Sequence, residues 1–269
     1  MQNNARGTRL KFYQVDSFTD ELFRGNPAGV CLLGSEWLPE CLMQDIAAEN
    51  NLSETAFVVC DGAGFAIRWF TPTAEVELCG HATLATAHVL FNHENVASNA
   101  LEFSSLSGKL GVANKDGMLI LDFPRCNVQQ ISFEEKLDCF DVTPIEAWQG
   151  AEEYLLVFEN EAQVRGAVCN LRKAAKIDLS GIIITARADT PPIDFVSRYF
   201  TPKFGIDEDP ATGSVHTLLV PYWQSVMGKA NFEALQVSKR GGRLSCAAEG
   251  DRIKIAGKAV TYLVGELLL

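Results

Sequence analysis

The sequence is poor in the residues that build metal centres. Only four of its 269 residues are histidine, and its eight cysteines are scattered without a C-x-x-C pair. Neither an H-E-x-x-H motif nor a Cys/His cluster with zinc spacing occurs, so we expect no metal site. A chain of this length without an export signal is expected to keep its thiols reduced.

Positive charge is also scarce. The chain has 23 Lys and Arg against 34 Asp and Glu, a net charge of −11. This balance argues against a nucleic-acid partner, because phosphate contacts need a basic face. No apolar run approaches the roughly 18 residues of a membrane-spanning helix, and the start MQNNARGTRLKFYQVDSF lacks the apolar core of a signal peptide. We therefore expect a cytoplasmic protein without a membrane partner.

Low-complexity tracts and Ser/Gly linkers are absent, and short apolar runs dominate instead. A helix is predicted over 39–50, where Leu42, Ile46 and Glu49 recur at helical spacing. The chain shows no βαβ rhythm and no G-x-G-x-x-G, which excludes a nucleotide-binding doubly wound sheet. Strands are predicted at 11–18, 30–33, 55–60, 64–70, 118–123, 154–158, 181–185, 194–200 and 259–264.

Two segments of the chain resemble each other. Residues 69–91 read WFTPTAEVELCGHATLATAHVLF, and residues 199–223 read YFTPKFGIDEDPATGSVHTLLVPYW. Each has an aromatic-Phe-Thr-Pro motif, an acidic stretch, and then a glycine, Gly80 or Gly213, before an apolar helix-like stretch. Repeat arrays have periods of roughly 20–50 residues. A repeat of about half the chain therefore indicates two similar halves.

In each copy the glycine is predicted to open a helix. The first turn of a helix leaves backbone N–H groups without partners, and its dipole favours an anion. Two such helix starts, at Gly80 and at Gly213-Ser214, facing each other across one cleft would bind a small carboxylate. The other interpretation is ordinary capping, in which Thr212 or Ser214 satisfies its own helix.

Glu49 is the first candidate for proton transfer. On the predicted helix it shares a face with Leu42 and Ile46, so its carboxylate is expected to point inward. Burial and the negative end of the helix dipole both favour the protonated form, which suits a general acid–base. The alternative is a solvated glutamate beside a turn.

Three further residues near the glycines are candidates for a catalytic role. Asp209 precedes the second helix start and is either a second proton-handling group or a helix cap. His81 opens the first helix, where the dipole favours its neutral form. Cys79 stands before Gly80, at a place that lowers a thiol pKa. Thr212 fills the matching place in the second copy, so a paired-thiol racemase lacks its partner here.

These segments resemble the PhzF-like (phenazine biosynthesis-like) family. The resemblance is carried by the motifs GNPAGV, LCGHATL and DEDPATGS in this order, and it runs from about residue 10 to the C-terminus. It implies an α+β, diaminopimelate epimerase-like fold of two pseudo-symmetric halves, each a curled, mostly antiparallel sheet around a central helix. The halves are expected at 1–124 and 125–269, with the C-terminal strand returning to the first half.

The resemblance also implies residue roles. Glu49 matches the family's catalytic glutamate, and His81 and Asp209 match the polar residues that assist it. Gly80, Gly213 and Ser214 match the positions that hold the substrate carboxylate. The family enzyme with an established role isomerises a dihydro-hydroxyanthranilate without metal or organic cofactor, and homodimers are usual. Cys-Gly-His at residues 79–81, in place of that enzyme's Ala-Gly-His, points to the broader subgroup.

Three functions follow from these observations. The leading one is a cofactor-independent isomerase in which Glu49 moves a proton between carbons of a small carboxylate. The second is an epimerase or racemase that uses Glu49 on one face of the substrate and Asp209 or Cys79 on the other. The third is a non-catalytic binding or interaction protein that keeps the fold.

Overall fold

The computed structural model describes residues 7, 9–60, 62, 64–133 and 137–269. The chain divides into two compact units, the first made of Met1–Leu121 with Lys258–Leu269 and the second of Asp122–Gly257. No helix in the described residues is long and apolar enough to cross a membrane.

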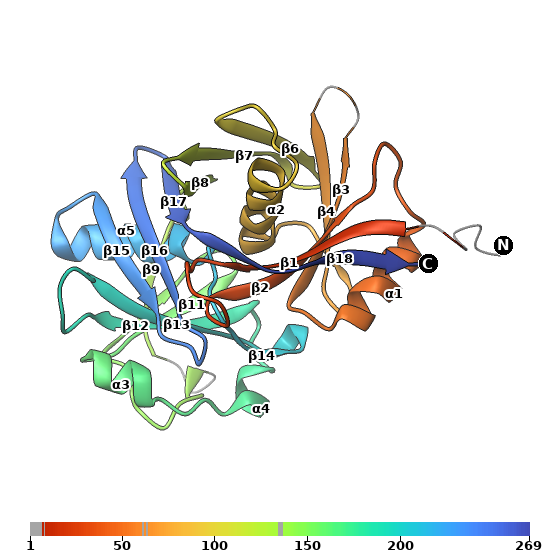
Figure 1. Ribbon diagram of the computed structural model, residues 1–269. Helices are drawn as coiled ribbons and strands as arrows, with labels where there is room; N and C mark the ends of the chain where they lie inside the picture. Colours follow the sequence, from red (N-terminus) through yellow and green to blue (C-terminus); the bar gives the residue numbers. More distant parts are fainter. Residues whose placement is uncertain (1–6, 8, 61, 63, 134–136) are drawn as a thin grey trace. The chain divides into compact units, whose positions relative to one another are not determined.

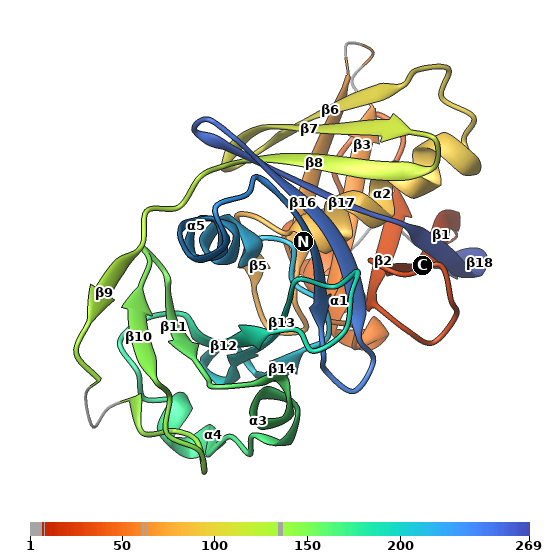
Figure 2. The same ribbon diagram turned by 90° about the vertical axis from the view of Figure 1, so that its left-hand side faces the viewer.

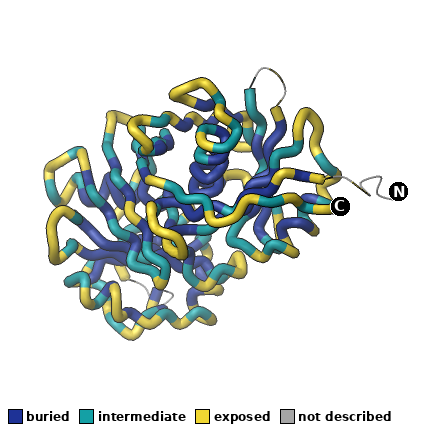
Figure 3. The backbone as a smooth tube through the Cα atoms, viewed as in Figure 1, coloured by how far each residue is buried: buried dark blue, intermediate teal, exposed yellow. Residues whose placement is uncertain are grey.

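The first unit is a sheet with two helices. Its helix α2 packs against β1, β2, β3, β7 and β18, and Figure 3 shows α2 as an almost continuously buried coil. The other helix, α1, covers a core that includes Met43, Phe57 and Phe70. The elements are β1 Arg9–Ser17, β2 Asn26–Leu32, α1 Glu40–Asn50, β3 Glu54–Cys60, β4 Phe65–Phe70, β5 Glu75–Val76, α2 Gly80–Asn92, β6 Ala100–Ser105, β7 Gly108–Lys115, β8 Met118–Pro124 (of which Asp122–Pro124 fall in the second unit) and β18 Ala259–Leu268.

The second unit contains a similar set of helices and strands. Its longest helix, α5, packs against β16 and β17, and a separate core gathers around Tyr154, Phe158 and Phe200. Figure 2 shows β10, β11, β12 and β13 following one another in this unit. The elements are β9 Gln129–Ile131, β10 Glu146–Gln149, β11 Glu153–Val157, α3 Glu161–Gly166, α4 Leu171–Ala174, β12 Gly181–Arg187, β13 Phe195–Thr201, η2 Pro202–Phe204, β14 Ile206–Asp209, α5 His216–Met227, β15 Asn231–Gln236, β16 Gly242–Glu249 and β17 Arg252–Gly257.

The two units repeat one pattern of strand pairing. In the first, β1–β2 is antiparallel, β2–β3 parallel, β3–β4 and β4–β5 antiparallel, β4–β6 parallel, and β6–β7 and β7–β8 antiparallel. In the second, β10 to β17 pair in the same order with the same directions. Helix α2 follows β5, and α5 follows β14. The internal duplication predicted from the two FTP segments is therefore confirmed.

In each unit one further strand pairs antiparallel with the first strand of the repeated pattern. In the first unit the C-terminal strand β18 pairs with β1, and Figure 1 shows the two side by side. In the second unit β9 pairs with β10. The mostly antiparallel pairing agrees with the predicted fold class.

Side chains at the FTP motifs repeat as well. In the first unit Arg68 makes a two-pronged ion pair with Glu75, at 2.6 Å for each prong, and its guanidinium lies over Phe70. In the second unit Arg198 pairs in the same way with Glu208, at 2.7 and 2.9 Å, and lies over Phe200. Such planar, bidentate pairs fix orientation better than a single contact does. They hold β4 against β5 and β13 against β14, the strands that lead to the glycine segments.

Candidate functional site

Helix α2 begins at Gly80, as predicted. Its N-cap residue Cys79 is extended and makes no side-chain capping hydrogen bond. Two other hydrogen bonds fix the start of the helix. From β1 the Ser17 hydroxyl donates to the His81 carbonyl oxygen at 2.8 Å, and within the helix the Thr83 hydroxyl donates to the Cys79 carbonyl oxygen at 2.6 Å. The capping alternative is therefore wrong for this helix start.

His81 is enclosed at this helix start, with only 5% of its surface exposed. Its Nδ1 atom lies 3.5 Å from the Cys79 sulfur, and its Nε2 atom lies 3.3 Å from an oxygen of Glu54. Burial lowers the pKa of His81 to about 3, because desolvation penalises the imidazolium. The ring is therefore neutral near pH 7, as predicted, but burial is the cause and not the helix dipole.

Glu49 lies in the last turn of α1 and is exposed, so the predicted inward orientation is wrong. The buried residues of α1 are Met43, Ile46 and Ala47. With about 3.6 residues per turn, their common direction is roughly 110° from Glu49. Leu42, which set the predicted face, is only half-buried. The segment after Glu49 is anchored, since the Asn50 amide donates to the Thr55 hydroxyl at 3.3 Å.

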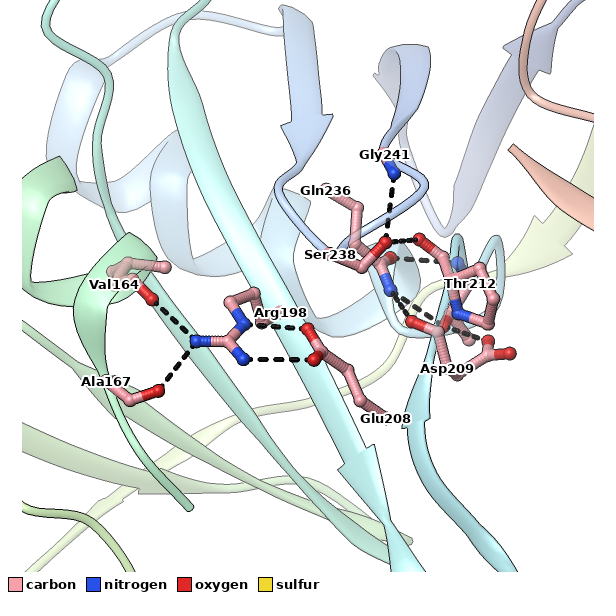
Figure 4. Close-up of polar contacts among 10 residues, drawn as sticks. Val164, Ala167, Arg198, Glu208, Asp209, Thr212, Gln236, Ser238 and Gly241 are labelled. Atoms are coloured by element: carbon pink, nitrogen blue, oxygen red, sulfur yellow. Dashed lines mark hydrogen bonds and ion pairs between the residues drawn. The ribbon is translucent and has the colours of Figure 1, made fainter. Parts of the chain in front are cut away.

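In the second unit, Asp209 ends β14 and is buried, with 6% of its surface exposed. The Thr212 hydroxyl donates a short hydrogen bond to its carboxylate. Gln236, fully buried on β15, donates to the Asp209 carbonyl oxygen at 2.7 Å and accepts from the Thr212 backbone N–H at 2.8 Å. Figure 4 shows Asp209, Thr212 and Gln236 converging, with the Ser238 hydroxyl bonded to the loop at Pro210.

The prediction that Gly213 opens a helix is wrong by three residues, because α5 begins at His216. Residues 213–217 form a tighter turn, in which the N–H groups of His216 and Thr217 donate to the carbonyl oxygens of Gly213 and Ser214. Neither predicted cap acts on α5, whose N-cap makes no side-chain capping bond. The Thr212 hydroxyl is hydrogen-bonded to Asp209, and Gly213 is buried within the loop.

Two side chains of these sites were missed by sequence reasoning. Glu54 contacts His81 from the first residue of β3, and Gln236 holds the Asp209 loop from the last residue of β15. A signal for Gln236 exists, because it alternates with Phe232 and Ala234 and so falls on the inward face of its strand. No local signal identifies Glu54, which reaches His81 across 27 positions.

Glu54, Cys79 and His81 also form a group that could hold a metal ion, with one donor atom from each within 4.8 Å of the others. Carboxylate, thiolate and imidazole are the ligands that zinc takes. The two short contacts, however, use opposite nitrogens of the His81 ring. The three donor atoms nevertheless lie close to one another, and neither Nε2 of His81 nor Oε2 of Glu54 has a hydrogen-bond partner among the described residues.

Comparison with known proteins places the chain in a family. The model of the phenazine biosynthesis-like protein family matches residues 15–265. A Pseudomonas aeruginosa protein named as an uncharacterized isomerase is 45% identical over 262 residues, covering 97% of this chain and 99% of that protein. A PhzF-family crystal structure from Enterococcus faecalis superposes with a TM-score of 0.93 at 44% identity, over 97% of this chain and 100% of the other.

The chain thus belongs to the phenazine biosynthesis-like family. Its fold is shared more widely: a hydroxyproline epimerase from Agrobacterium vitis superposes with a TM-score of 0.60 at 12% identity, covering 100% of this chain and 94% of that one. The protein therefore has the α+β, diaminopimelate epimerase-like fold that the motifs imply.

Proposed function

We propose that the protein is an isomerase that moves a proton between carbons of a small carboxylate substrate without a cofactor, with Glu49 as general acid–base. The isomerase class is supported by the family and by the names of its relatives. The exposed position of Glu49 leaves its carboxylate accessible to a substrate, but it removes the burial that was expected to favour the protonated form. Because Glu49 is exposed, water is excluded from its carboxylate only when the substrate is bound.

The substrate carboxylate binds in this proposal at the backbone of Gly80, Gly213 and Ser214. The observation that carries it is the start of α2, a thirteen-residue helix whose N-cap side chain makes no capping bond. Backbone N–H groups at such a start attract an anion, and the helix dipole adds to the attraction. Gly213 and Ser214 contribute from a turn that precedes α5, and not from a helix start.

His81 and Asp209 assist the transfer in this proposal. A neutral His81 can orient or polarise the substrate without adding a positive charge to the site. Asp209 is held by Thr212 and Gln236, so its carboxylate is preorganised. The physiological assembly that we propose is a homodimer, with a small molecule as the other partner.

A crystal structure with a bound small carboxylate tests the binding site. We expect one carboxylate to accept hydrogen bonds from backbone N–H groups at both Gly80 and Gly213, with Glu49 and Asp209 lining the same cleft. Distances near 2.9 Å are the expected result. A carboxylate held at only one of the two glycines, or a Glu49 remote from it, would contradict the proposed site.

An epimerase or racemase is the second candidate. It is favoured by Cys79, whose sulfur contacts a neutral imidazole and could act on the substrate face opposite Glu49. The stereochemistry of deuterium incorporated from solvent separates the two, because an isomerase moves the label to another carbon and an epimerase inverts the labelled one.

A further inference from the structure

Glu54, Cys79 and His81 bring three kinds of metal ligand together in the first unit. Cys79 and His81 stand at the start of α2, and Glu54 is the first residue of β3. One donor atom from each lies within 4.8 Å of the other two. In the described part of the chain, no other three His, Cys, Asp or Glu side chains form such a group.

The His81 ring has a nitrogen without a hydrogen bond. The residue is 5% exposed, and its Nε2 atom has no hydrogen-bond partner among the described residues. That atom faces the Glu54 carboxylate, at 3.3 Å from the nearer oxygen. Buried polar atoms are normally hydrogen-bonded, and an exception calls for an explanation such as a bound ion. The ring therefore points to a ligand at this group.

The separations between the donor atoms suit one small ion. Zinc binds sulfur, nitrogen and oxygen at about 2.0 to 2.3 Å in a tetrahedron, which places two of its ligands roughly 3.3 to 3.7 Å apart. The Cys79 sulfur lies 3.5 Å from Nδ1 of His81, and Nε2 lies 3.3 Å from Glu54. One ion uses one ring nitrogen, so the group closes around it by a movement of about 1 Å at the more distant side chain.

The backbone that carries the three ligands is held in place. The Cys79 carbonyl oxygen accepts from the Thr83 hydroxyl, and the His81 carbonyl oxygen accepts from the Ser17 hydroxyl. Glu54 begins β3, which pairs with β2 on one side and with β4 on the other. Metal sites need ligands on rigid elements, and a helix start and a paired strand provide them.

The ligand types select zinc among the common ions. Calcium and magnesium take oxygen ligands, whereas this group offers one sulfur and one imidazole nitrogen. Thiolate, imidazole and carboxylate are all ligands of zinc, and three protein ligands leave its fourth position open to water. The negative charges of the thiolate and the carboxylate balance the two positive charges of the ion, which lowers the cost of enclosing it.

We propose that Glu54, Cys79 and His81 bind a zinc ion at the start of α2, and that bound zinc inhibits the isomerase. The Cys79 thiol releases its proton to solvent as the ion binds, and sulfur, one ring nitrogen and one carboxylate oxygen each donate an electron pair in place of a zinc-bound water. Nothing is oxidised or reduced. Inhibition follows because His81, which assists proton transfer, is then held by the ion. Zinc is thus a regulator that a chelator removes, and not a cofactor.

Equilibrium dialysis of the full chain against zinc chloride tests the site, with the protein first stripped by a chelator and kept reduced. We expect one zinc per chain. Cys79→Ser should weaken binding by about 10²-fold or more, because losing even an outer-shell partner costs about 10- to 100-fold. Glu54→Gln should weaken it at least tenfold.

Two control variants exclude zinc bound elsewhere. Changing both exposed cysteines, Cys41 and Cys60, to serine should leave the affinity unchanged. His93→Gln should leave it unchanged as well. His93 follows α2 at its far end, where its Nε2 atom and that of His88 both contact the Thr261 hydroxyl, so a histidine pair there is the main competing site.

Binding of less than one zinc per chain would overturn the proposal. So would an affinity that falls in a control variant but not in Cys79→Ser. If Cys79→Ser fails to fold, absorption of the cobalt-loaded protein decides instead, measured on the variant that lacks Cys41 and Cys60. A sulfur-to-cobalt charge-transfer band is expected there, and its absence would contradict a thiolate ligand.

The inhibition rests on the proposed function, whereas the zinc site does not. Zinc at the concentration that fills the site should abolish deuterium exchange in the wild type, and Glu54→Gln should need at least tenfold more. Exchange that persists with the site filled would overturn the inhibition alone. Zinc binding without exchange into any carboxylate would overturn the inhibition and the proposed function together, while exchange without zinc binding would overturn only the site.

Discussion

Replacing Glu49 by glutamine is expected to lower proton exchange by about 10² or more, with the fold unchanged. Removal of a general acid–base group costs about this much, since glutamine can neither take nor return a proton. The fold should persist because Glu49 is exposed in the last turn of α1 and is not among the buried residues of that helix. Exchange is measured as deuterium incorporated into a carboxylate substrate, and stability by thermal melting.

Asp45→Asn is the matched control for this variant. Asp45 is an exposed acid on the same helix, one turn earlier, and the substitution removes one negative charge in the same way. We expect it to keep both the melting temperature and the exchange rate. A Glu49→Gln protein that exchanges at the wild-type rate would remove Glu49 from the mechanism.

Asp209→Asn is expected to have the second-largest effect, a loss of exchange of about 10² with cooperative unfolding retained. Asparagine keeps the shape of aspartate and its oxygen still accepts from the Thr212 hydroxyl, so the loop held by Gln236 should stay in place. What is lost is the negative charge of a carboxylate enclosed at 6% exposure.

Thr212→Val tests whether Asp209 acts through its charge or through its place in the loop. It removes the hydroxyl that donates to Asp209 and accepts from the Gln236 amide at 3.2 Å, but keeps the Thr212 backbone N–H bonded to Gln236. If Asp209 acts through its charge, Thr212→Val should retain at least a tenth of the wild-type rate while Asp209→Asn does not. Equal losses in the two variants would instead assign Asp209 a structural role as a loop anchor.

The nine predicted strands and the duplication were found because their signals are local, whereas other strands, such as β6, β7 and β14 to β17, were not predicted. The Arg-aromatic-Phe-Thr-Pro motif recurs with its arginine, and both arginines make the same bidentate pair in the structure. Helix α1 matches its predicted range to within a residue, since Pro39 directly precedes it. Periodicity and turn residues suffice to place such elements along the chain.

The side chains of the site depend on contacts that the sequence does not display. The face of α1 was misjudged because Leu42 is apolar yet only half-buried, and this shifted the expected core towards Glu49. The start of α5 was misjudged because Gly213 and Ser214 close a turn before the helix begins. Glu54 reaches His81 only through the pairing of β3 within the sheet, a long-range contact that no local pattern reports.

The central claim is that this protein transfers a proton at carbon without a cofactor. It is tested most directly by incubating the full chain in D₂O with a panel of small carboxylates, with a chelator present throughout, and reading mass and stereochemistry of each compound. The account predicts that at least one carboxylate gains carbon-bound deuterium and that Glu49→Gln abolishes the gain. A carboxylate that binds at the glycine segments but gains no deuterium would contradict the account and identify a binding protein.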